Sequence, residues 1–324
     1  MTTPPARLRV GAMAAFAGAV PAAWSIGAVP GLGIVRVFLP AVAAVAIAAA
    51  VVVWRHHWRA PLVASTLGAL FAVALVVSPQ RPEDAEGPVG ETVRVAFSNL
   101  LLDNRDPAAA DAFAALEADL VVTAETNGQQ FLEFQERFGP PVVVGGDDAA
   151  CSLDGPGRCS SLNVWTDLPV HTVRTSELLR SVRGVQFVVE TAVGPLEVVA
   201  VHPPAPSVRW WRPGSTTPWG NAALLRDLAR TFGGPEGPDV LIGDFNLTDR
   251  QPEFAALVEG RTDALRAHRW AGPTSRTWWG RLLRARIDHI LVDDRWCIAA
   301  PGTIDVPGSD HLGVVSDLGR CASE

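Results

Sequence analysis

The first 80 residues contain three long apolar segments without a single charge, and they divide the chain into two parts. The segments are 10–35, 37–54 and 60–78. Spanning a bilayer takes about 20 apolar residues, and each segment is close to that length. A cleaved signal peptide would explain the first segment alone, and buried core helices are a second alternative. Because three such apolar segments follow one another, the sequence favours a membrane anchor in residues 1–80. Its three transmembrane helices are expected at about 10–29, 34–54 and 60–78.

Arginine placement predicts the orientation of these helices. Arg7 and Arg9 precede the first segment, and Arg55 and Arg59 separate the second from the third. The turn at 30–33, between the first two segments, carries no charge. Because positively charged loops stay in the cytoplasm, the rest of the chain after about residue 80 is expected outside. The lipid bilayer is therefore a predicted partner, and the predicted location is the cell membrane, multi-pass, with an extracytoplasmic domain.

Beyond the apolar segments the pattern changes to short strands and amphipathic helices. Residues 81–91 are rich in proline, glycine and acidic residues, which predicts a linker. Alternating strands and helices over residues 92–324 favour a single layered α/β domain. Strands are expected at 93–97, 120–124, 142–144, 162–165, 185–190, 196–201, 240–242, 287–292 and around 314–315. Helices are expected at 107–118, 129–138 and 221–232.

Charge is divided unevenly between the two parts. Of the 27 basic and 34 acidic residues, six arginines and three acids lie in residues 1–90, so the outer part has ten more acidic than basic residues. An acidic domain is not attracted as a whole to nucleic acid. Residues 261–286 are an exception to this acidic charge. They contain seven arginines and one acidic residue, interleaved with tryptophans.

All four cysteines lie beyond the apolar segments, where disulfides are allowed. They are Cys151, Cys159, Cys297 and Cys321. Three pairings are possible, and Cys151 with Cys159 is favoured because this pair closes a short loop. Four free thiols are the alternative. The spacing CxxC is missing from the sequence, which argues against a cysteine metal site.

Acidic, amide and imidazole residues follow or open several of the expected strands. They are Asn99, Glu125, His202, Asp244 and Asn246 of the motif GDFN, Asp288, Asp310 and His311. Each one alone fits a surface turn or a helix cap. Together, hard oxygen donors and two histidines suit a divalent metal ion and a phosphate ester. Hydrolysis of such an ester needs charge neutralisation, a polarised water and donors for the developing negative charge.

In their order along the chain, the motifs SNL, AE, HPP, GDFN, RIDHIL and SDH resemble the endonuclease/exonuclease/phosphatase superfamily of DNase I-like and sphingomyelinase-like enzymes. The resemblance covers about residues 92–318. It implies a four-layered α/β sandwich with two central sheets and a site at their shared rim. The anchor layout also looks like that of teicoplanin-resistance-associated membrane proteins of actinomycetes, a membrane-anchored type of the same superfamily.

The resemblance also implies roles for the residues at the strand ends. Glu125, with Asn99 and Asp310, would hold Mg²⁺ or Mn²⁺. Asp244 would orient or deprotonate the attacking water, and Asn246 and His202 would hold the phosphate. His311 would contact the scissile phosphate as a base or as an electrostatic donor, with Asp288 fixing its ring. The implied class is a metal-dependent hydrolase that acts on phosphate ester bonds.

Three substrate classes remain open for such an enzyme. A lipid-linked phosphate or diphosphate at the outer leaflet suits the anchor and the acidic domain. A nucleic acid suits the arginine and tryptophan stretch, where Arg276 and Trp278 are expected to bind substrate by backbone contact and stacking. A small soluble phosphate ester is the third class. A domain that binds without catalysis is the alternative of a different kind.

Overall fold

The computed structural model describes residues 86–145, 158–159, 162–206, 216, 218–234, 236–267, 271–275 and 285–322. Within these residues, none of the helices combines the length and the hydropathy that crossing a membrane requires. The three predicted transmembrane helices and residues 81–85 of the predicted linker lie outside the described residues, so they stay predictions.

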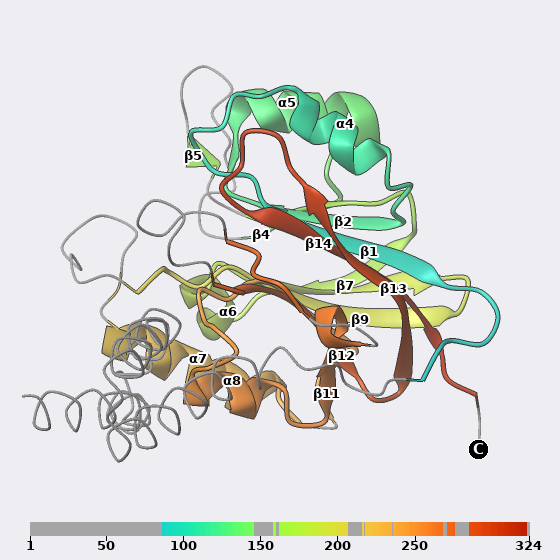
Figure 1. Ribbon diagram of the computed structural model, residues 1–324, viewed down its shortest axis with the longest axis vertical. Helices are drawn as coiled ribbons and strands as arrows, with labels where there is room; N and C mark the ends of the chain where they lie inside the picture. Colours follow the sequence, from blue (N-terminus) through green and yellow to red (C-terminus); the bar gives the residue numbers. More distant parts are fainter. Residues whose placement is uncertain are drawn as a thin grey trace, which may run out of the picture.

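Two mixed β-sheets form the centre of the domain (Figure 1). The first sheet contains, in spatial order, β13 (Trp296–Asp305), β14 (Leu312–Arg320), β1 (Val93–Asn99), β2 (Leu120–Ala124), β6 (Leu162–Trp165) and β4 (Val143–Gly145). The second contains β11 (Arg261–Asp263), β12 (Asp288–Asp293), β10 (Val240–Asp244), β9 (Gly194–Val201), β8 (Val185–Thr191) and β7 (Val170–Arg174). A short ribbon pairs β3 (Thr126–Asn127) with β5 (Arg158–Cys159).

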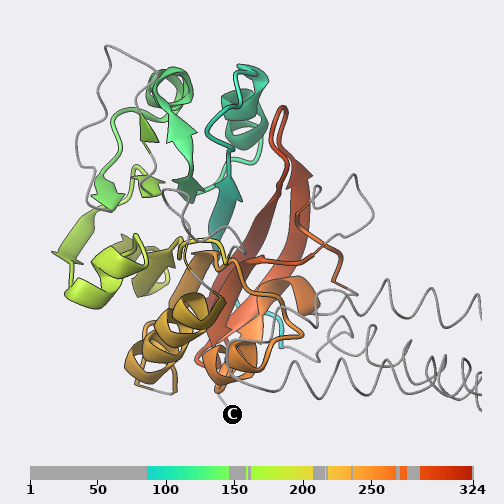
Figure 2. The ribbon, with the colours of Figure 1, turned by 90° about the vertical axis from the view of Figure 1, so that its left-hand side faces the viewer.

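Helices cover the outer face of each sheet (Figures 1 and 2). The first sheet carries α4 (Ala108–Ala114) and α5 (Gly128–Phe138). The second carries α6 (Glu177–Ser181), α7 (Pro218–Phe232) and α8 (Pro252–Leu257). A 3₁₀ turn, η3 (Ala264–Arg266), follows β11.

Alternation along the strands explains why the layers stack in this way. In β1, Val95 and Phe97 face the second sheet, and Ala96 between them faces the helices. In β10, Ile242 faces the first sheet and Leu241 faces α7 and α8. Both faces of these central strands are therefore apolar, as strands covered on two sides require. The predicted four-layered α/β sandwich is confirmed.

The strands and helices expected from sequence are present, with bounds shifted by a few residues. The helix expected from 107 begins at Ala108, whose N–H is accepted by the Asp106 carboxylate at 3.0 Å. Among the described residues, eight elements were not predicted: β3, β5, β7, α6, α8, β11, η3 and β13. Strand β13 contains Pro301 and Gly302 at a register shift against β14, which interrupts its alternation.

A disulfide joins Cys297 in β13 to Cys321 just after β14. This is the pair that remains if Cys151 binds Cys159, the pairing favoured from sequence. Cys151 itself lies outside the described residues, so that half of the pairing stays a prediction.

Candidate active site at the shared rim of the two sheets

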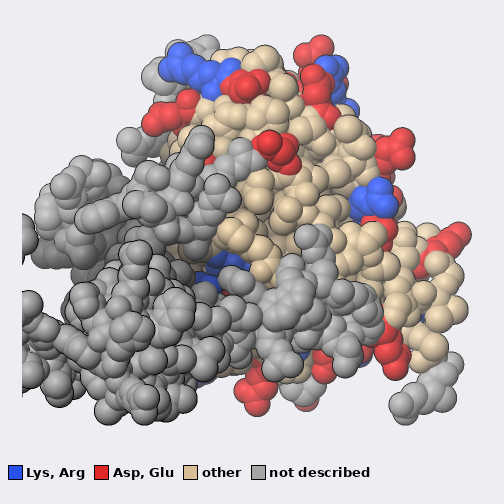
Figure 3. Space-filling view, in the orientation of Figure 1, with Lys and Arg blue, Asp and Glu red and all other residues tan. Residues whose placement is uncertain are grey.

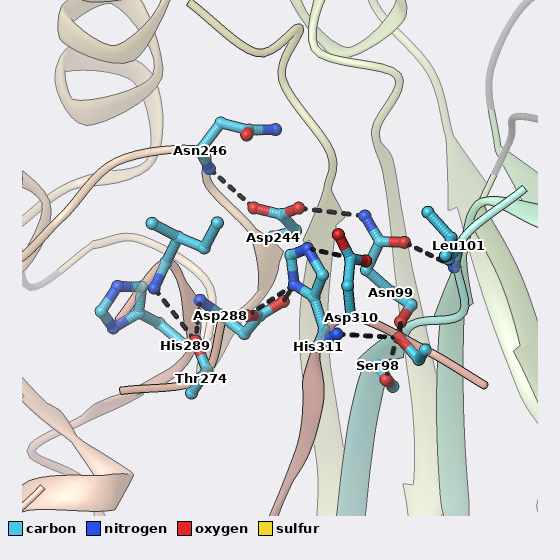
Figure 4. Close-up of polar contacts among 12 residues, drawn as sticks. Ser98, Asn99, Leu101, Asp244, Asn246, Thr274, Asp288, His289, Asp310 and His311 are labelled. Carbon is cyan, nitrogen blue, oxygen red and sulfur yellow. Dashed lines mark hydrogen bonds and ion pairs between the residues drawn. The ribbon is translucent and has the colours of Figure 1, made fainter. Parts of the chain in front are cut away.

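The strand directions bring the polar strand ends to one edge. Strands β1 and β2 run parallel, so Asn99, which ends β1, lies beside the start of the turn at Glu125. Strands β9 and β10 are also parallel, which places His202 next to the end of β10. Strand β12 runs the opposite way, and its first residue, Asp288, pairs with Asp244 in the ladder. The carboxyl ends of the parallel strands thus meet at one rim (Figure 4).

Asp244 lies at the centre of this rim and is 1% exposed. Its Oδ2 accepts a hydrogen bond from Asn99 Nδ2 at 3.1 Å, and its Oδ1 accepts one from the Asn246 N–H at 2.9 Å. Burial raises the pKa of the Asp244 carboxyl, and the nearby Asp288 raises it further, while His311 and His202 partly offset both effects. Asp244 therefore holds its proton more readily than an exposed aspartate.

The glycine before Asp244 has a packing role that the sequence did not predict. Gly243 lies inside β10. Its φ is +153°, and a Cβ there would lie 1.9 Å from the carbonyl oxygen of Val201. Only glycine allows β10 to approach β9 this closely. This close approach holds Asp244 beside His202.

The segment after Asp244 does not stay extended. Asn246 has a φ of +49°, which is left-handed. Asp244 and Asn246 are therefore not alternate residues of one extended strand. The Asn246 side chain instead donates from Nδ2 to the Pro203 carbonyl at 3.0 Å. This bond ties the GDFN turn to the segment that follows His202.

The imidazole of His311 is held by Asp288. His311 Nδ1 lies 2.9 Å from Asp288 Oδ2 and 3.0 Å from Oδ1, and Asp288 is fully buried. Burial lowers the pKa of His311, but the charge and hydrogen bond of Asp288 outweigh it, with help from Asp244 and Asp310. The resulting pKa is about 10. At neutral pH the ring is a cation whose Nδ1 proton is donated to Asp288.

Glu125 occupies the turn between β2 and α5. Its φ of +53° is unfavourable for a non-glycine residue and costs about 1 kcal/mol. The cap of α5 is Asn127, whose side chain accepts from the Gln130 N–H, so Glu125 is not needed as a helix cap. A strained carboxylate without a capping role is a typical functional feature.

The Glu125 carboxylate faces His202 and Asn99. Its Oε1 lies 3.4 Å from His202 Nε2, and the same nitrogen lies 3.8 Å from Asp244 Oδ2. Burial raises the pKa of Glu125, but hydrogen bonds from His202 and Asn99 and the charges of His202 and His311 lower it to about 2. Glu125 is thus a carboxylate at every ordinary pH, and its side chain keeps 25% of its surface exposed.

The donor set fits a hard divalent cation. Asp244, Asp288 and His311 offer ligand atoms within 4.8 Å of one another. Of these, the Asp288 and His311 atoms are already hydrogen bonded to each other. Asn99 turns its Nδ2 toward Asp244, and its Oδ1 accepts from the Leu101 N–H at 3.0 Å. The carboxylates of Glu125 and Asp244 are the hard oxygen donors that Mg²⁺ prefers. A cation there would also relieve the repulsion that raises the pKa of Asp244.

The remaining predicted site residues are only partly placed. Asp310 is half-buried, with Oδ1 3.9 Å from His311 Nε2, so it lies at the open side of the histidine ring. Arg276 and Trp278 lie outside the described residues. The described residues on either side of them adjoin the site: Ser275 forms a β-bridge with His311, and its N–H donates to the Ala285 carbonyl at 2.9 Å.

Two hydroxyl residues support the site and were not assigned roles from sequence. Thr274 is buried, and its Oγ1 accepts from the N–H groups of Ile287 and Asp288, each at 3.1 Å. Ser309 is buried between Asn99 and His311. Neither residue belongs to a periodic sequence pattern. The one sequence feature that could have pointed to Ser309 is its position directly before Asp310 and His311.

A two-sheet α/β sandwich with acids, amides and imidazoles at its rim defines a class of proteins that includes phosphate-ester hydrolases. The profile described as the Endonuclease/Exonuclease/phosphatase family matches residues 96–311, and the chain belongs to that family. Members of the superfamily are usually metal-dependent phosphoester hydrolases. No curated protein sequence matches the chain.

Several solved structures share the fold. The endonuclease/exonuclease/phosphatase from Beutenbergia cavernae DSM 12333 is 19% identical with a TM-score of 0.50, and 72% of each chain is covered. The one from Bacteroides vulgatus is 17% identical with a TM-score of 0.51, covering 71% of this chain and 100% of the other. A functionally unknown conserved protein from Enterococcus faecalis V583 is 14% identical with a TM-score of 0.51, covering 70% and 100%. These likenesses show the fold alone.

Proposed function

We propose that this protein is a membrane-anchored, divalent-metal-dependent phosphoesterase that acts outside the cytoplasm. The observation that carries the proposal is the buried Asp288–His311 pair, which faces Asp244 and adjoins the carboxylate of Glu125. A histidine cation and hard oxygen donors on one rim match the charge distribution of a phosphate ester under attack.

The residues of the rim divide the chemical tasks. Glu125, Asn99 and Asp310 would hold Mg²⁺ or Mn²⁺, which when bound supplies Lewis-acid polarisation of a phosphoryl oxygen. Asp244, whose pKa is raised by burial, orients the attacking water and accepts its proton. Asn246 and His202 hold the phosphate. His311 is already protonated at neutral pH, so it acts as a donor to a phosphoryl oxygen rather than as a base.

A lipid-linked phosphate or diphosphate at the outer leaflet is the preferred substrate class. The predicted anchor would keep the rim close to lipid headgroups, and the excess of acidic residues after residue 90 does not favour a polyanion. Trp210, Trp211, Trp278 and Trp279 provide aromatic residues of the kind that rest at a membrane interface.

Cleavage of DNA or RNA outside the cell is the second candidate, favoured by the arginine and tryptophan stretch. Two of its seven arginines are not available to bind a nucleic acid backbone. Arg261 is buried and donates to the Pro238 carbonyl at 2.7 Å, and Arg286 is buried against Asp249 and Asp263. On the face drawn in Figure 3, the arginines of the described residues are scattered and do not form one patch.

A substrate panel tests the proposal. Full-length protein in lipid nanodiscs with Mg²⁺ would be offered a polyprenyl diphosphate, a phosphoinositide, sphingomyelin, plasmid DNA and RNA. If the substrate is a lipid-linked phosphate, the protein should hydrolyse it in Mg²⁺ and not in EDTA, and should leave the nucleic acids intact. Cleavage of DNA or RNA alone would establish the second candidate. Binding of a phosphate ester without turnover under all conditions would establish a non-catalytic domain.

A further inference from the structure

We propose that Ser309 is a positioning residue whose hydroxyl fixes the main chain of His311 to the end of β1. This rests on the proposed function, because that function assigns His311 and Asn99 to one reaction site. Ser309 Oγ donates to the Asn99 carbonyl at 2.7 Å and accepts from the His311 N–H at 2.9 Å. Ser309 is 6% exposed, so water does not readily replace either bond.

The two partners of this hydroxyl belong to two different polar pairs of the rim. Asn99 donates from its side chain to Asp244, and His311 donates from its ring to Asp288. Figure 4 shows both pairs side by side. The His311 N–H donates to the Ser309 hydroxyl, which in turn donates to the Asn99 carbonyl. The Ser309 hydroxyl therefore links the main chain of His311 to the main chain of Asn99, which is itself a predicted metal ligand.

Other contacts hold the loop that carries Ser309. Asn104 Nδ2 donates to the Pro307 carbonyl at 2.9 Å, and the Ser309 N–H donates to the Val306 carbonyl at 3.2 Å. Gly308 has a φ of +76°, and a Cβ there would lie 1.9 Å from Asn104 Oδ1. The loop thus stays in place without the Ser309 hydroxyl. Removing that hydroxyl would take away the acceptor of the His311 N–H, while the β-bridge between Ser275 and His311 and the rest of the loop remain.

Ser98 provides a matched control for this hydroxyl. Its Oγ donates to the same Asn99 carbonyl at 3.0 Å, and the residue is fully buried. In the described part of the chain, the Ser98 hydroxyl forms no hydrogen bond with His311. Ser98→Ala and Ser309→Ala therefore delete the same group next to the same carbonyl, but only the second deletes the acceptor of the His311 N–H.

The experiment compares the parent with Ser309→Ala, Ser98→Ala and Ser309→Thr in the full-length chain. Hydrogen exchange measured by mass spectrometry on peptides across His311 needs no substrate. We expect exchange at the His311 amide to become about tenfold faster in Ser309→Ala, because a buried N–H loses its acceptor. Ser98→Ala and Ser309→Thr should leave this amide as slow as in the parent.

Kinetics with the substrate identified by the panel give the second readout. Ser309→Ala should lower kcat by about 10- to 100-fold and change KM by less than about threefold, because small misplacement affects the chemical step more than binding. Ser98→Ala should stay within about twofold of the parent, and Ser309→Thr should recover most of kcat.

Equal exchange at His311 in Ser309→Ala and Ser98→Ala would overturn the proposal. So would equal kcat in these two variants, or a loss in Ser309→Ala that Ser309→Thr does not recover. If the parent turns over none of the substrates, the proposed function fails, and the exchange result still decides whether Ser309 holds His311.

Discussion

His311 Nδ1 lies 2.9 Å from Oδ2 of Asp288, which is fully buried, and this contact sets the charge of the rim. The folded pKa of His311, about 10, lies above its ordinary value of 6.5. The protonated ring therefore contributes stability that is fully present below pH 6.5 and is lost as the pH rises through 10. Because Nδ1 donates to Asp288, the proton of the cation that can be offered to substrate is the one on Nε2, and activity should persist at mildly alkaline pH.

Asp288→Asn should move the alkaline limit of activity to lower pH. The amide keeps the shape of Asp288 and removes the charge that raises the pKa of His311. We expect the alkaline limb of kcat against pH to begin near 7 in the variant and near 10 in the parent. At pH 7 the loss should be about 10²-fold, smaller than the loss in His311→Ala, because orienting groups contribute less than contacting ones. An unchanged alkaline limb would show that Asp288 does not control the His311 charge.

Glu125→Gln should remove metal-dependent activity without unfolding the domain. The residue is strained and makes no cap for α5, so the fold does not depend on its charge. We expect at least about a 10²-fold loss of activity at saturating Mg²⁺ and an unchanged circular dichroism spectrum. Glu136→Gln, in the exposed part of α5, is the control and should behave like the parent. Full turnover by Glu125→Gln would remove Glu125 from the predicted metal site.

A buried ion-pair cluster behind the rim should contribute more to stability than any surface pair. Arg286 Nη2 lies 2.9 Å from Asp249 Oδ2, and both side chains are 2% exposed. Asp249→Asn leaves a buried guanidinium without part of its compensation, and the expected loss in the free energy of unfolding is about 3–5 kcal/mol. Asp111→Asn breaks the exposed pair with Arg137 and should cost less than about 1 kcal/mol. Urea denaturation of both variants measures the difference, and equal losses would contradict it.

The Cys297–Cys321 disulfide should stabilise the domain without affecting the rim. It lies at the end of β13 and β14 opposite His311, which precedes the first residue of β14. Replacing both cysteines by serine removes a cross-link between residues 24 apart, which should cost about 3 kcal/mol. Thermal unfolding and kcat of the double variant test this together. A large drop in kcat with unchanged stability would show an unrecognised path to the site.

The orientation of the chain in the membrane decides which substrates the site can reach. An alkaline phosphatase fused to the C-terminus should be active, and one fused within residues 55–59 should be inactive, because arginine-rich loops stay in the cytoplasm. Protease added to intact spheroplasts should digest residues 85–324. Protection of that segment would place the site in the cytoplasm and exclude an outer-leaflet substrate.

Much of the fold was predictable because the central strands are short, nearly continuous apolar runs, as expected for strands covered on both faces. Strand β2 and strand β6 have the bounds expected from sequence, since their residues are buried on both faces. Strand β7 was missed because most of its residues are exposed. Helix α8 was missed because six residues are too few to show the periodicity of a helix. Pro301 and Gly302 concealed β13.

The site was predictable to the extent that its residues end strands. Asn99, Asp244 and Asp288 occupy strand termini, where the chain direction determines their meeting point. The turn at Asn246, the close approach at Gly243 and the Ser309 hydroxyl depend on contacts between segments far apart in the sequence. No local pattern encodes those contacts.

Whether the rim hydrolyses phosphate esters with the help of a metal ion can be decided by comparing three turnover measurements. Turnover of the best panel substrate would be measured for the parent in Mg²⁺, the parent in EDTA, and His311→Ala in Mg²⁺. We expect turnover in the first case, none in the second, and a loss of about 10³-fold or more in the third. Equal turnover in EDTA, or full activity of His311→Ala, would contradict metal-dependent hydrolysis at the rim.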